Sequence, residues 1–378
     1  MILGLILTSS KHFRSHTAFI KRNFQTFVSS AWLKNQLSAS HELSSDLRLL
    51  DASWQSNGQG YEQLYKQMIL GLILTSSKHF RSHTAFIKRN FQTFVSSAWL
   101  KNQLSASHEL SSDLRLLDAS WQSNGQGYEQ LYKQAHIPHA VYFDLYKCCI
   151  GTKEIPLNLP EPECWTKYVQ SLGVSTDTHV VVYDGQNMRL AFRTWWLFRL
   201  YGHENVSVLD GGLIKWAEDG YEITVEEPRV EKPGNFQGQL NKALMRTFED
   251  MQRNVRVQSE QVVDVREAKA FEGDLGETPE SRNGHIPGSL NIPYSLFFNE
   301  DMTFKSKEEL NDLFEDAGLD LDKPIVSSCF LGLTGCAVNV ATHMFGKKNT
   351  ALYYGSWNEW RLRVNASECE TGPPRRKG

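Results

Sequence analysis

The feature that most constrains the fold is a weak internal repeat in the chain after residue 95. The motif His136-Ile137-Pro138 recurs as His285-Ile286-Pro287, and a short apolar strand pattern follows each copy. A strand pattern that ends in aspartate precedes each copy, at 114–118 and at 261–264. Two diverged copies of one folding unit explain such paired order better than a single domain does.

Each copy continues in the same way after its motif. Buried-type strand patterns at 178–184 and 323–329 run into loops, and helical patterns at 190–201 and 335–345 follow those loops. Alternating strands and helices are typical of an α/β fold with a parallel-rich sheet flanked by helices. Right-handed crossovers bring the loops after the strands to one edge, where α/β sheets bind ligands.

These patterns predict the domain boundaries. We place the first domain at 95–224 and the second at 243–365. The stretch 225–242 is rich in Pro, Glu and Lys, which is typical of an inter-domain linker. Residues 366–378 form a tail rich in Gly, Pro and basic residues, and we expect it to fray.

A second repeat is of a different kind, because residues 1–67 recur letter for letter as residues 68–134. Evolved structural repeats drift in sequence, so perfect identity indicates a recent exon duplication or an error in the gene model. Only the second copy continues into a complete domain. We therefore expect 1–67 to be surplus, and the alternative is a genuine extra half-domain.

The segment 68–94 contains no Asp or Glu but several Lys and Arg residues. In the identical first copy, Phe13, Ile20, Phe24 and Phe27 fall on one helical face by their spacing. A basic amphipathic leader resembles a mitochondrial transit peptide, so we expect a mitochondrial location, with the cytoplasm as the alternative. An ordinary surface helix would show the same pattern.

Composition excludes several classes of protein. The formal net charge of -3 gives no reason to expect nucleic acid as a partner, and no apolar run is long enough for a membrane span. The six cysteines show neither a disulfide framework nor zinc-ligand spacing, so we expect no metal and a reducing compartment. We interpret the adjacent Cys148 and Cys149 as incidental and Cys336 as a core residue.

Cys329 is the candidate nucleophile. It follows a predicted strand at 324–328 and precedes a helix that we expect to begin near Gly335. The free N–H groups of a helix N-terminus and of the preceding loop favour an anion, and the thiolate is the nucleophilic form of cysteine. Gly332 permits a tight turn there, and the Thr334 hydroxyl can cap the helix or contact the sulfur. The first half carries Asp184 at the matching position, so we expect only the second half to be catalytic.

Together these motifs resemble the two-domain rhodanese family, which includes thiosulfate and 3-mercaptopyruvate sulfurtransferases. The resemblance covers about residues 95–365. It is carried by these motifs: Leu117-Asp118-Ala119-Ser120-Trp121, His136-Ile137-Pro138, Leu209-Asp210-Gly211-Gly212, Val263-Asp264-Val265-Arg266, Gly284-His285-Ile286-Pro287-Gly288, Cys329 with Gly332 and Thr334, and Tyr354-Gly355-Ser356-Trp357-Asn358-Glu359-Trp360.

The resemblance implies two tandem rhodanese-like domains and transfer of a sulfane sulfur through a persulfide on Cys329. It implies a small donor, either thiosulfate or 3-mercaptopyruvate, and a thiol or cyanide acceptor, with a thioredoxin-like reductant as a further partner. No cofactor is implied. The substrate-binding residues it suggests are Arg282, Gly332, Leu333 and Thr334.

The chain departs from the family pattern around the candidate site. Phe330 and Leu331 stand where the relatives carry polar or basic loop residues. Ala270 falls where a substrate-binding Arg is expected, and Leu157 falls where a His is expected. Each charged hydrogen bond lost is worth roughly 1.5–3 kcal/mol. A non-catalytic rhodanese-like binding or regulatory protein is therefore the alternative function.

A cysteine phosphatase on a related fold is a third hypothesis. Such a site needs an Arg six residues after the cysteine to clamp phosphate, and Gly335 occupies that position. The sequence disfavours this function.

Overall fold

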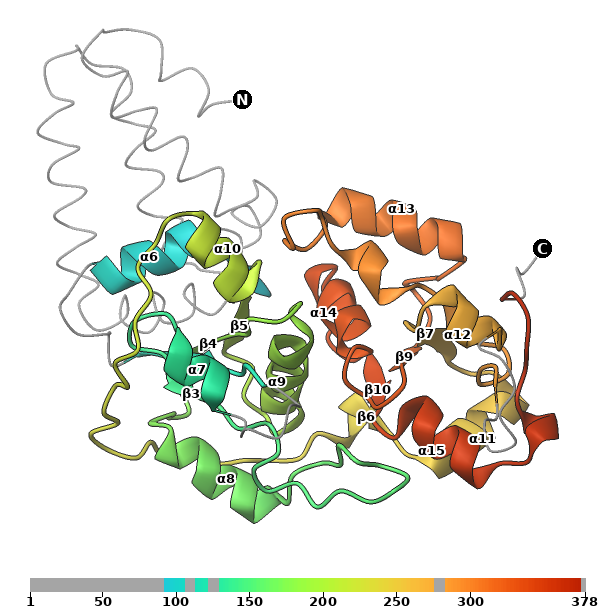
Figure 1. Cartoon of the computed structure of the whole chain (residues 1–378). Helices are drawn as coiled ribbons and strands as arrows, with labels where there is room; N and C mark the ends of the chain where they lie inside the picture. Colours follow the sequence, from blue (N-terminus) through green and yellow to red (C-terminus); the bar gives the residue numbers. More distant parts are fainter. Residues whose placement is uncertain (1–91, 106–112, 122–128, 275–282, 375–378) are drawn as a thin grey trace, which may run out of the picture. The chain divides into compact units, whose positions relative to one another are not determined.

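The computed structural model describes residues 92–105, 113–121, 129–274 and 283–374. The duplicated segment 1–67, nearly all of the predicted leader 68–94 and the predicted substrate-binding Arg282 lie outside these residues. The described residues form two parallel sheets flanked by helices, as the sequence predicted (Figure 1).

The first sheet has the strand order β1-β5-β4-β2-β3, and all its pairs are parallel. Its strands are β1 (Phe94–Val95), β2 (Leu114–Asp118), β3 (Val141–Tyr142), β4 (His179–Tyr183) and β5 (Val206–Leu209). Its helices are α6 (Ser97–Ser105), α7 (Gln130–Gln134), α8 (Pro162–Ser171), α9 (Arg189–Leu200) and α10 (Gly212–Glu218).

The second sheet repeats this topology, with the order β6-β10-β9-β7-β8 and parallel pairs throughout. Its strands are β6 (Met245–Arg246), β7 (Gln261–Asp264), β8 (Leu290–Asn291), β9 (Ile325–Ser328) and β10 (Ala351–Tyr353). Its helices are α11 (Phe248–Val257), α12 (Ala268–Glu272), α13 (Lys307–Ala317), α14 (Cys336–Met344) and α15 (Ser356–Arg363). The predicted internal repeat is therefore one strand order used twice.

The strand register fixes which residues of the two domains correspond. Asp118 of β2 pairs with Tyr183 of β4, and Asp264 of β7 pairs with Ser328 of β9. The next residue after Tyr183 is Asp184, and the next after Ser328 is Cys329. Asp184 and Cys329 thus leave their sheets at equivalent points, at the carboxyl edge of a parallel sheet.

Local signals explain why these elements form where they do. The central strands are buried on both faces because helices cover both sides of a parallel sheet, and all four residues of β9 are buried. Helices α11 and α13 begin with capping boxes, Thr247 with Asp250 and Ser306 with Glu309, which satisfy N-terminal N–H groups. Helix α8 begins at Pro162, which has no N–H to satisfy.

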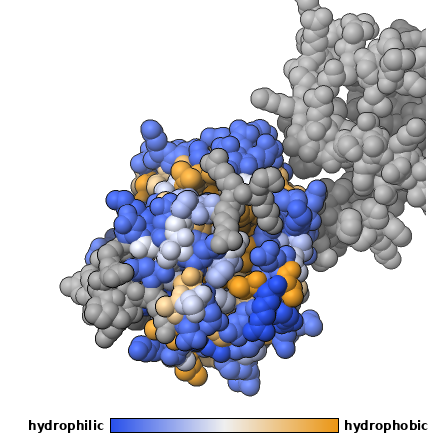
Figure 2. Space-filling model, turned by 90° about the vertical axis from the view of Figure 1, so that its right-hand side faces the viewer, coloured by the Kyte–Doolittle hydropathy of each residue, from blue (hydrophilic) through white to orange (hydrophobic). Residues whose placement is uncertain are grey.

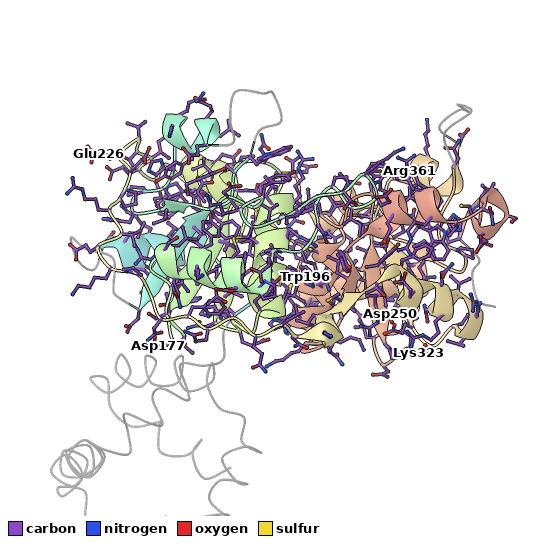
Figure 3. The ribbon with its side chains drawn as sticks, turned by 90° about the horizontal axis from the view of Figure 1, so that it is seen from below. Asp177, Trp196, Glu226, Asp250, Lys323 and Arg361 are labelled. Carbon is purple, nitrogen blue, oxygen red and sulfur yellow. A yellow bond between two sulfur atoms is a disulfide. The ribbon has the colours of Figure 1, made fainter. Side chains whose placement is uncertain are left out.

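The two domains share one hydrophobic core, because helices α9 and α14 pack against each other (Figure 1). The Trp196 indole on α9 donates a hydrogen bond to the carbonyl oxygen of Leu244 at 3.2 Å, and Figure 3 shows Trp196 beside the second domain. The predicted linker region packs closely as well: Phe236 is buried, and the Gly234 N–H donates to the carbonyl of Gln170.

Both histidines of the repeated motif have structural roles. His136 is buried, stacks on the Tyr132 ring and hydrogen-bonds the Tyr132 carbonyl oxygen through Nδ1 at 2.7 Å. His285 does the same with Phe271, its ring centroid 3.6 Å away and its Nδ1 2.8 Å from the carbonyl oxygen. In each domain the imidazole therefore links the loop to the helix before it.

One prediction about the cysteines is wrong. Cys148 and Cys164 form a disulfide, although their spacing gave no sign of a framework. The loop after β3 folds back on α8, which brings Cys148 next to a cysteine that lies 16 residues away in sequence. Cys329, Cys336 and Cys149 carry free thiols.

The described surface is mostly hydrophilic. Figure 2 shows one face with polar residues over most of its area and small, separate hydrophobic spots. Within the described residues, no helix has the length and apolar composition of a membrane span.

Candidate active site

Cys329 lies directly after β9, and the loop that follows it leads into α14. Strand and helix hold this loop from both ends. At its start, the N–H of Cys329 donates to the Ser356 Oγ at 3.1 Å. At its end, Cys336 N–H and Ala337 N–H donate to the carbonyl oxygens of Leu333 and Thr334, which forms the first turn of the helix.

The N-terminus of a second helix, α15, also orients the loop. The N–H groups of Trp357 and Asn358 donate to the carbonyl oxygens of Cys329 and Phe330, each at 3.0 Å. These carbonyls are thereby turned toward α15 and held there.

The sulfur of Cys329 accepts one main-chain hydrogen bond. The N–H of Leu333 lies 3.2 Å from Sγ, and the Ser356 Oγ lies 3.9 Å from it. The Ser356 hydroxyl is also 2.8 Å from the Tyr353 carbonyl oxygen. The predicted support of the sulfur by loop amides is thus present at one N–H group, that of Leu333.

Gly332 makes this geometry possible. Its φ of +73° lies in the left-handed region, and a Cβ at this position would come closer than 3.0 Å to the main chain of Tyr354. Only glycine fits both conditions without a shift of the loop. Thr334 does not cap the helix as expected, because the N-cap of α14 is Gly335, and no side chain caps it.

The thiol itself is buried, and Cys329 is only 1% exposed. The next residue, Phe330, is 45% exposed, and its ring lies 5.4 Å from the guanidinium of Arg361. Two surface pockets, of about 450 and 240 Å³, lie elsewhere, around Arg246 and around Tyr142. The sulfur therefore lies beneath a loop that exposes the apolar Phe330 at the surface.

Asp184 shows what the equivalent position does in the first domain. Its carboxylate accepts four main-chain hydrogen bonds, from Gln186, Met188, Leu190 and Ala191, at 2.7–3.1 Å. Burial raises the pKa of the Asp184 carboxyl to about 6, and the four N–H groups oppose that rise. The loop between strand and helix is thus an anion cradle, and in the first domain the protein's own carboxylate fills it.

Two titratable residues, Cys336 and Tyr294, interact electrostatically with Cys329. Cys336, the first residue of α14, has its thiol pKa raised to about 12 by burial. Burial also raises the pKa of Tyr294 well above its usual value; its hydroxyl donates to the Asn187 carbonyl oxygen of the first domain at 2.5 Å. Neither residue is ionised near neutral pH.

At two positions that depart from the family pattern, the main-chain carbonyl contacts an arginine. Leu157 is buried, and its carbonyl oxygen lies 3.4 Å from Nη2 of Arg193. The Ala270 carbonyl oxygen lies 3.4 Å from Nη1 of Arg266, whose guanidinium is paired with Asp264. Sequence reasoning gave no role to Ser356 or Arg193, although both contact the loop. Ser356 stood inside a quoted motif, but nothing in the sequence marked Arg193.

Comparison with known proteins agrees with this architecture. The Rhodanese-like domain family matches residues 96–219 and 246–363. The chain is 38% identical over 282 residues to thiosulfate sulfurtransferase of Rattus norvegicus, with 72% of this chain and 93% of that protein covered. It is 39% identical over 282 residues to 3-mercaptopyruvate sulfurtransferase of Mus musculus, with the same coverage.

A solved structure gives the same result. The crystal structure of SseA from Escherichia coli, described as a "Rhodanese" fold of 3-mercaptopyruvate sulfotransferases, matches with a TM-score of 0.61 and 34% identity. The match covers 70% of this chain and 99% of that one. The resemblance deduced from the motifs is thereby confirmed: the chain belongs to the rhodanese family and carries two tandem rhodanese-like domains.

Proposed function

We propose that this chain is a sulfurtransferase that moves a sulfane sulfur from a small donor to an acceptor through a persulfide on Cys329. The observation that carries the proposal is the hydrogen bond from Leu333 N–H to the Cys329 sulfur, in a loop whose counterpart holds a carboxylate by four N–H groups. Curated relatives at 38–39% identity are named as sulfurtransferases.

In the first half-reaction the Cys329 thiolate attacks the sulfane sulfur of the donor. With thiosulfate, a bond forms between Sγ and the outer sulfur, the donor's S–S bond breaks, and sulfite leaves with the electron pair. With 3-mercaptopyruvate, the C–S bond breaks and pyruvate enolate leaves, which then takes up a proton. Leu333 N–H stabilises the sulfur anion before and after the transfer.

In the second half-reaction an acceptor attacks the outer sulfur of the persulfide. Cyanide leaves as thiocyanate, a thiol leaves as a persulfide, and in both cases the electron pair of the broken S–S bond returns to Sγ. We propose small thiols or a thioredoxin-like dithiol as natural acceptors. Phe330, the residue after Cys329 in the sequence, is exposed and apolar, and we propose that it contacts the acceptor.

The decisive experiment is mass spectrometry of the full chain after incubation with thiosulfate or with 3-mercaptopyruvate. We expect the mass of one sulfur atom, about 32 Da, to be added to the peptide that contains Cys329, and the adduct to be discharged by cyanide. The Cys329→Ser variant should take up none. Cys336→Ser is the matched control, because Cys336 is an equally buried thiol whose raised pKa leaves it protonated.

The burial of Cys329 favours a second candidate, a non-catalytic rhodanese-like binding or regulatory protein. It makes the opposite prediction, since folded protein would then gain no sulfur from either donor. A mitochondrial location is a separate proposal that rests on the basic segment 68–94. Its test is whether these residues carry a fused fluorescent protein into mitochondria.

A further inference from the structure

Arg193 on α9 is a fully buried cation of the first domain that contacts the nucleophile loop of the second. Its exposure is 0%, and its guanidinium lies 4.6 Å from the centre of the Trp196 ring. Nη1 donates to the carbonyl oxygen of Gly332 at 3.0 Å, and Nη2 lies 3.4 Å from the carbonyl oxygen of Leu157. Within the described part of the chain, no carboxylate forms an ion pair with Arg193.

A buried guanidinium without a carboxylate partner destabilises the folded state, because its desolvation is not offset by an ion pair. The other buried arginine of α9, Arg199, is paired with Glu204 at 3.2 Å. The guanidinium of Arg193 instead contacts main-chain carbonyl oxygens, that of Gly332 in the nucleophile loop at 3.0 Å and that of Leu157 at 3.4 Å.

The peptide group that joins Gly332 to Leu333 touches both Arg193 and the reactive sulfur. Its carbonyl oxygen accepts the hydrogen bond from Arg193 Nη1, and its N–H is the group that lies 3.2 Å from Cys329 Sγ. The peptide is trans, so its C=O and N–H point in opposite directions. The guanidinium at one end therefore fixes the direction of the N–H at the other end.

The contact also polarises the peptide. A cation at the carbonyl oxygen draws electron density from the amide and strengthens the hydrogen bond that its N–H donates. We infer that Arg193 is a positioning residue for the reaction of Cys329: through the Gly332–Leu333 peptide it orients and polarises the N–H that stabilises the sulfur anion. The inference rests on the proposed function and adds that the non-catalytic domain supplies a charge to the site.

The groups that face Cys329 are few, which makes the effect measurable. Cys336 on α14 and Tyr294 before α13 interact with Cys329 electrostatically, and burial raises the pKa of each. Both groups stay protonated and neutral between about pH 5 and pH 9, because this range lies below the raised pKa of each group. A pH profile of Cys329 reactivity therefore reports the thiolate itself and the charge of Arg193.

The test is the pH dependence of iodoacetamide modification of the full chain, followed by mass spectrometry of the Cys329 peptide. In Arg193→Met we expect the midpoint of the profile to rise by about one pH unit, with a roughly tenfold slower reaction below it. Arg193→Lys keeps the charge without the fixed fork and should move the midpoint in the same direction by less. If Arg193→Met does not fold, the midpoint measured in Arg193→Lys tests the inference by itself.

The matched control is Arg199→Met. Arg199 also lies on α9, is also buried, stacks on Trp195 and donates to a second-domain carbonyl, that of Lys348, at 2.9 Å. That peptide does not touch the sulfur, so the variant should lose stability while its midpoint stays within about 0.3 units of the wild type.

A midpoint that is unchanged in both Arg193 variants, or that moves equally in Arg199→Met, would overturn the inference. Thiolate absorbance, with the spectrum of Cys329→Ser subtracted, gives the same midpoint without a reagent that must enter the loop. The measurement does not depend on turnover. A shifted midpoint in a protein that takes up no sulfur would refute the proposed function and leave the role of Arg193 intact.

Discussion

Replacement of Gly332 by alanine tests the geometry of the nucleophile loop most directly. Gly332 has a φ of +73°, and a Cβ there would approach the main chain of Tyr354 closer than 3.0 Å. Gly346 at the end of α14 has a similar φ of +83°, but a Cβ there would meet nothing within 4 Å. Gly332→Ala and Gly346→Ala therefore share the backbone strain and differ only in the clash.

The magnitudes follow from this difference. Alanine in the left-handed region destabilises the folded state by about 1–2 kcal/mol. The lower conformational entropy of the unfolded chain offsets about 0.4–1 kcal/mol of this loss. Gly346→Ala should thus lower the free energy of unfolding by about 1 kcal/mol. Gly332→Ala adds an overpacking cost of about 1–3 kcal/mol, because the atom it meets is main chain and cannot rotate away.

The loop relieves that clash by moving, which takes Leu333 N–H away from the sulfur. Loss of one preorganised donor reduces a rate on the order of 10²-fold, so sulfur uptake by Cys329 should fall by about that factor in Gly332→Ala and stay at the wild-type level in Gly346→Ala. Urea unfolding and the mass-spectrometric sulfur assay measure the two effects. Equal losses of stability in the two variants, or wild-type uptake in Gly332→Ala, would refute the reasoning.

Two predictions concern buried carboxyl groups. Asp184→Ala leaves four main-chain N–H groups without an acceptor and should lower the free energy of unfolding, measured in urea titrations, by about 3–5 kcal/mol. Asp184→Asn keeps one acceptor oxygen and should lower it by less. Equal losses in the two variants would contradict the role of the Asp184 carboxylate as the acceptor for these N–H groups. Burial raises the pKa of Asp210, which accepts a hydrogen bond from Phe304 N–H of the second domain, to about 6. Because the folded-state pKa lies above the unfolded value, its contribution to stability is complete below about pH 4 and is lost as the pH rises through 6. Asp210 should contribute a decline of roughly 1–2 kcal/mol over that range in thermal unfolding, allowing for partial exposure. Asp210→Asn should remove this part of the decline, while the part that comes from Asp184, whose pKa is also raised to about 6, remains.

Much of the fold was predictable because it is encoded locally. The strand patterns at 114–118 and 261–264 coincide with β2 and β7. The patterns at 178–184, 190–201, 323–329 and 335–345 lie within two residues of β4, α9, β9 and α14, whereas β3 and β8 end three residues before the predicted strands do. Continuous apolar runs bounded by loops are a strong signal for buried parallel strands. The equivalence of Asp184 with Cys329 also followed from the repeat, and the strand register bears it out.

The site was less predictable, because its contacts join residues that are distant in sequence. Arg193 and Gly332 lie 139 positions apart, and Cys329 and Ser356 lie 27 apart. The Cys148–Cys164 disulfide was missed for the same reason, since a loop conformation decides it. No periodicity or spacing in one sequence carries such information.

The amino-acid sequence alone determined that two α/β units follow one another and that a cysteine stands where the second unit's strand meets its helix. Those facts depend on apolar periodicity and on main-chain geometry, which act between near neighbours. The tertiary structure decided that the thiol is buried, that a single N–H group faces it, and that an arginine of the other domain holds the same peptide. Packing of α9 against α14 sets these contacts, and it depends on the shapes of side chains from both domains at once.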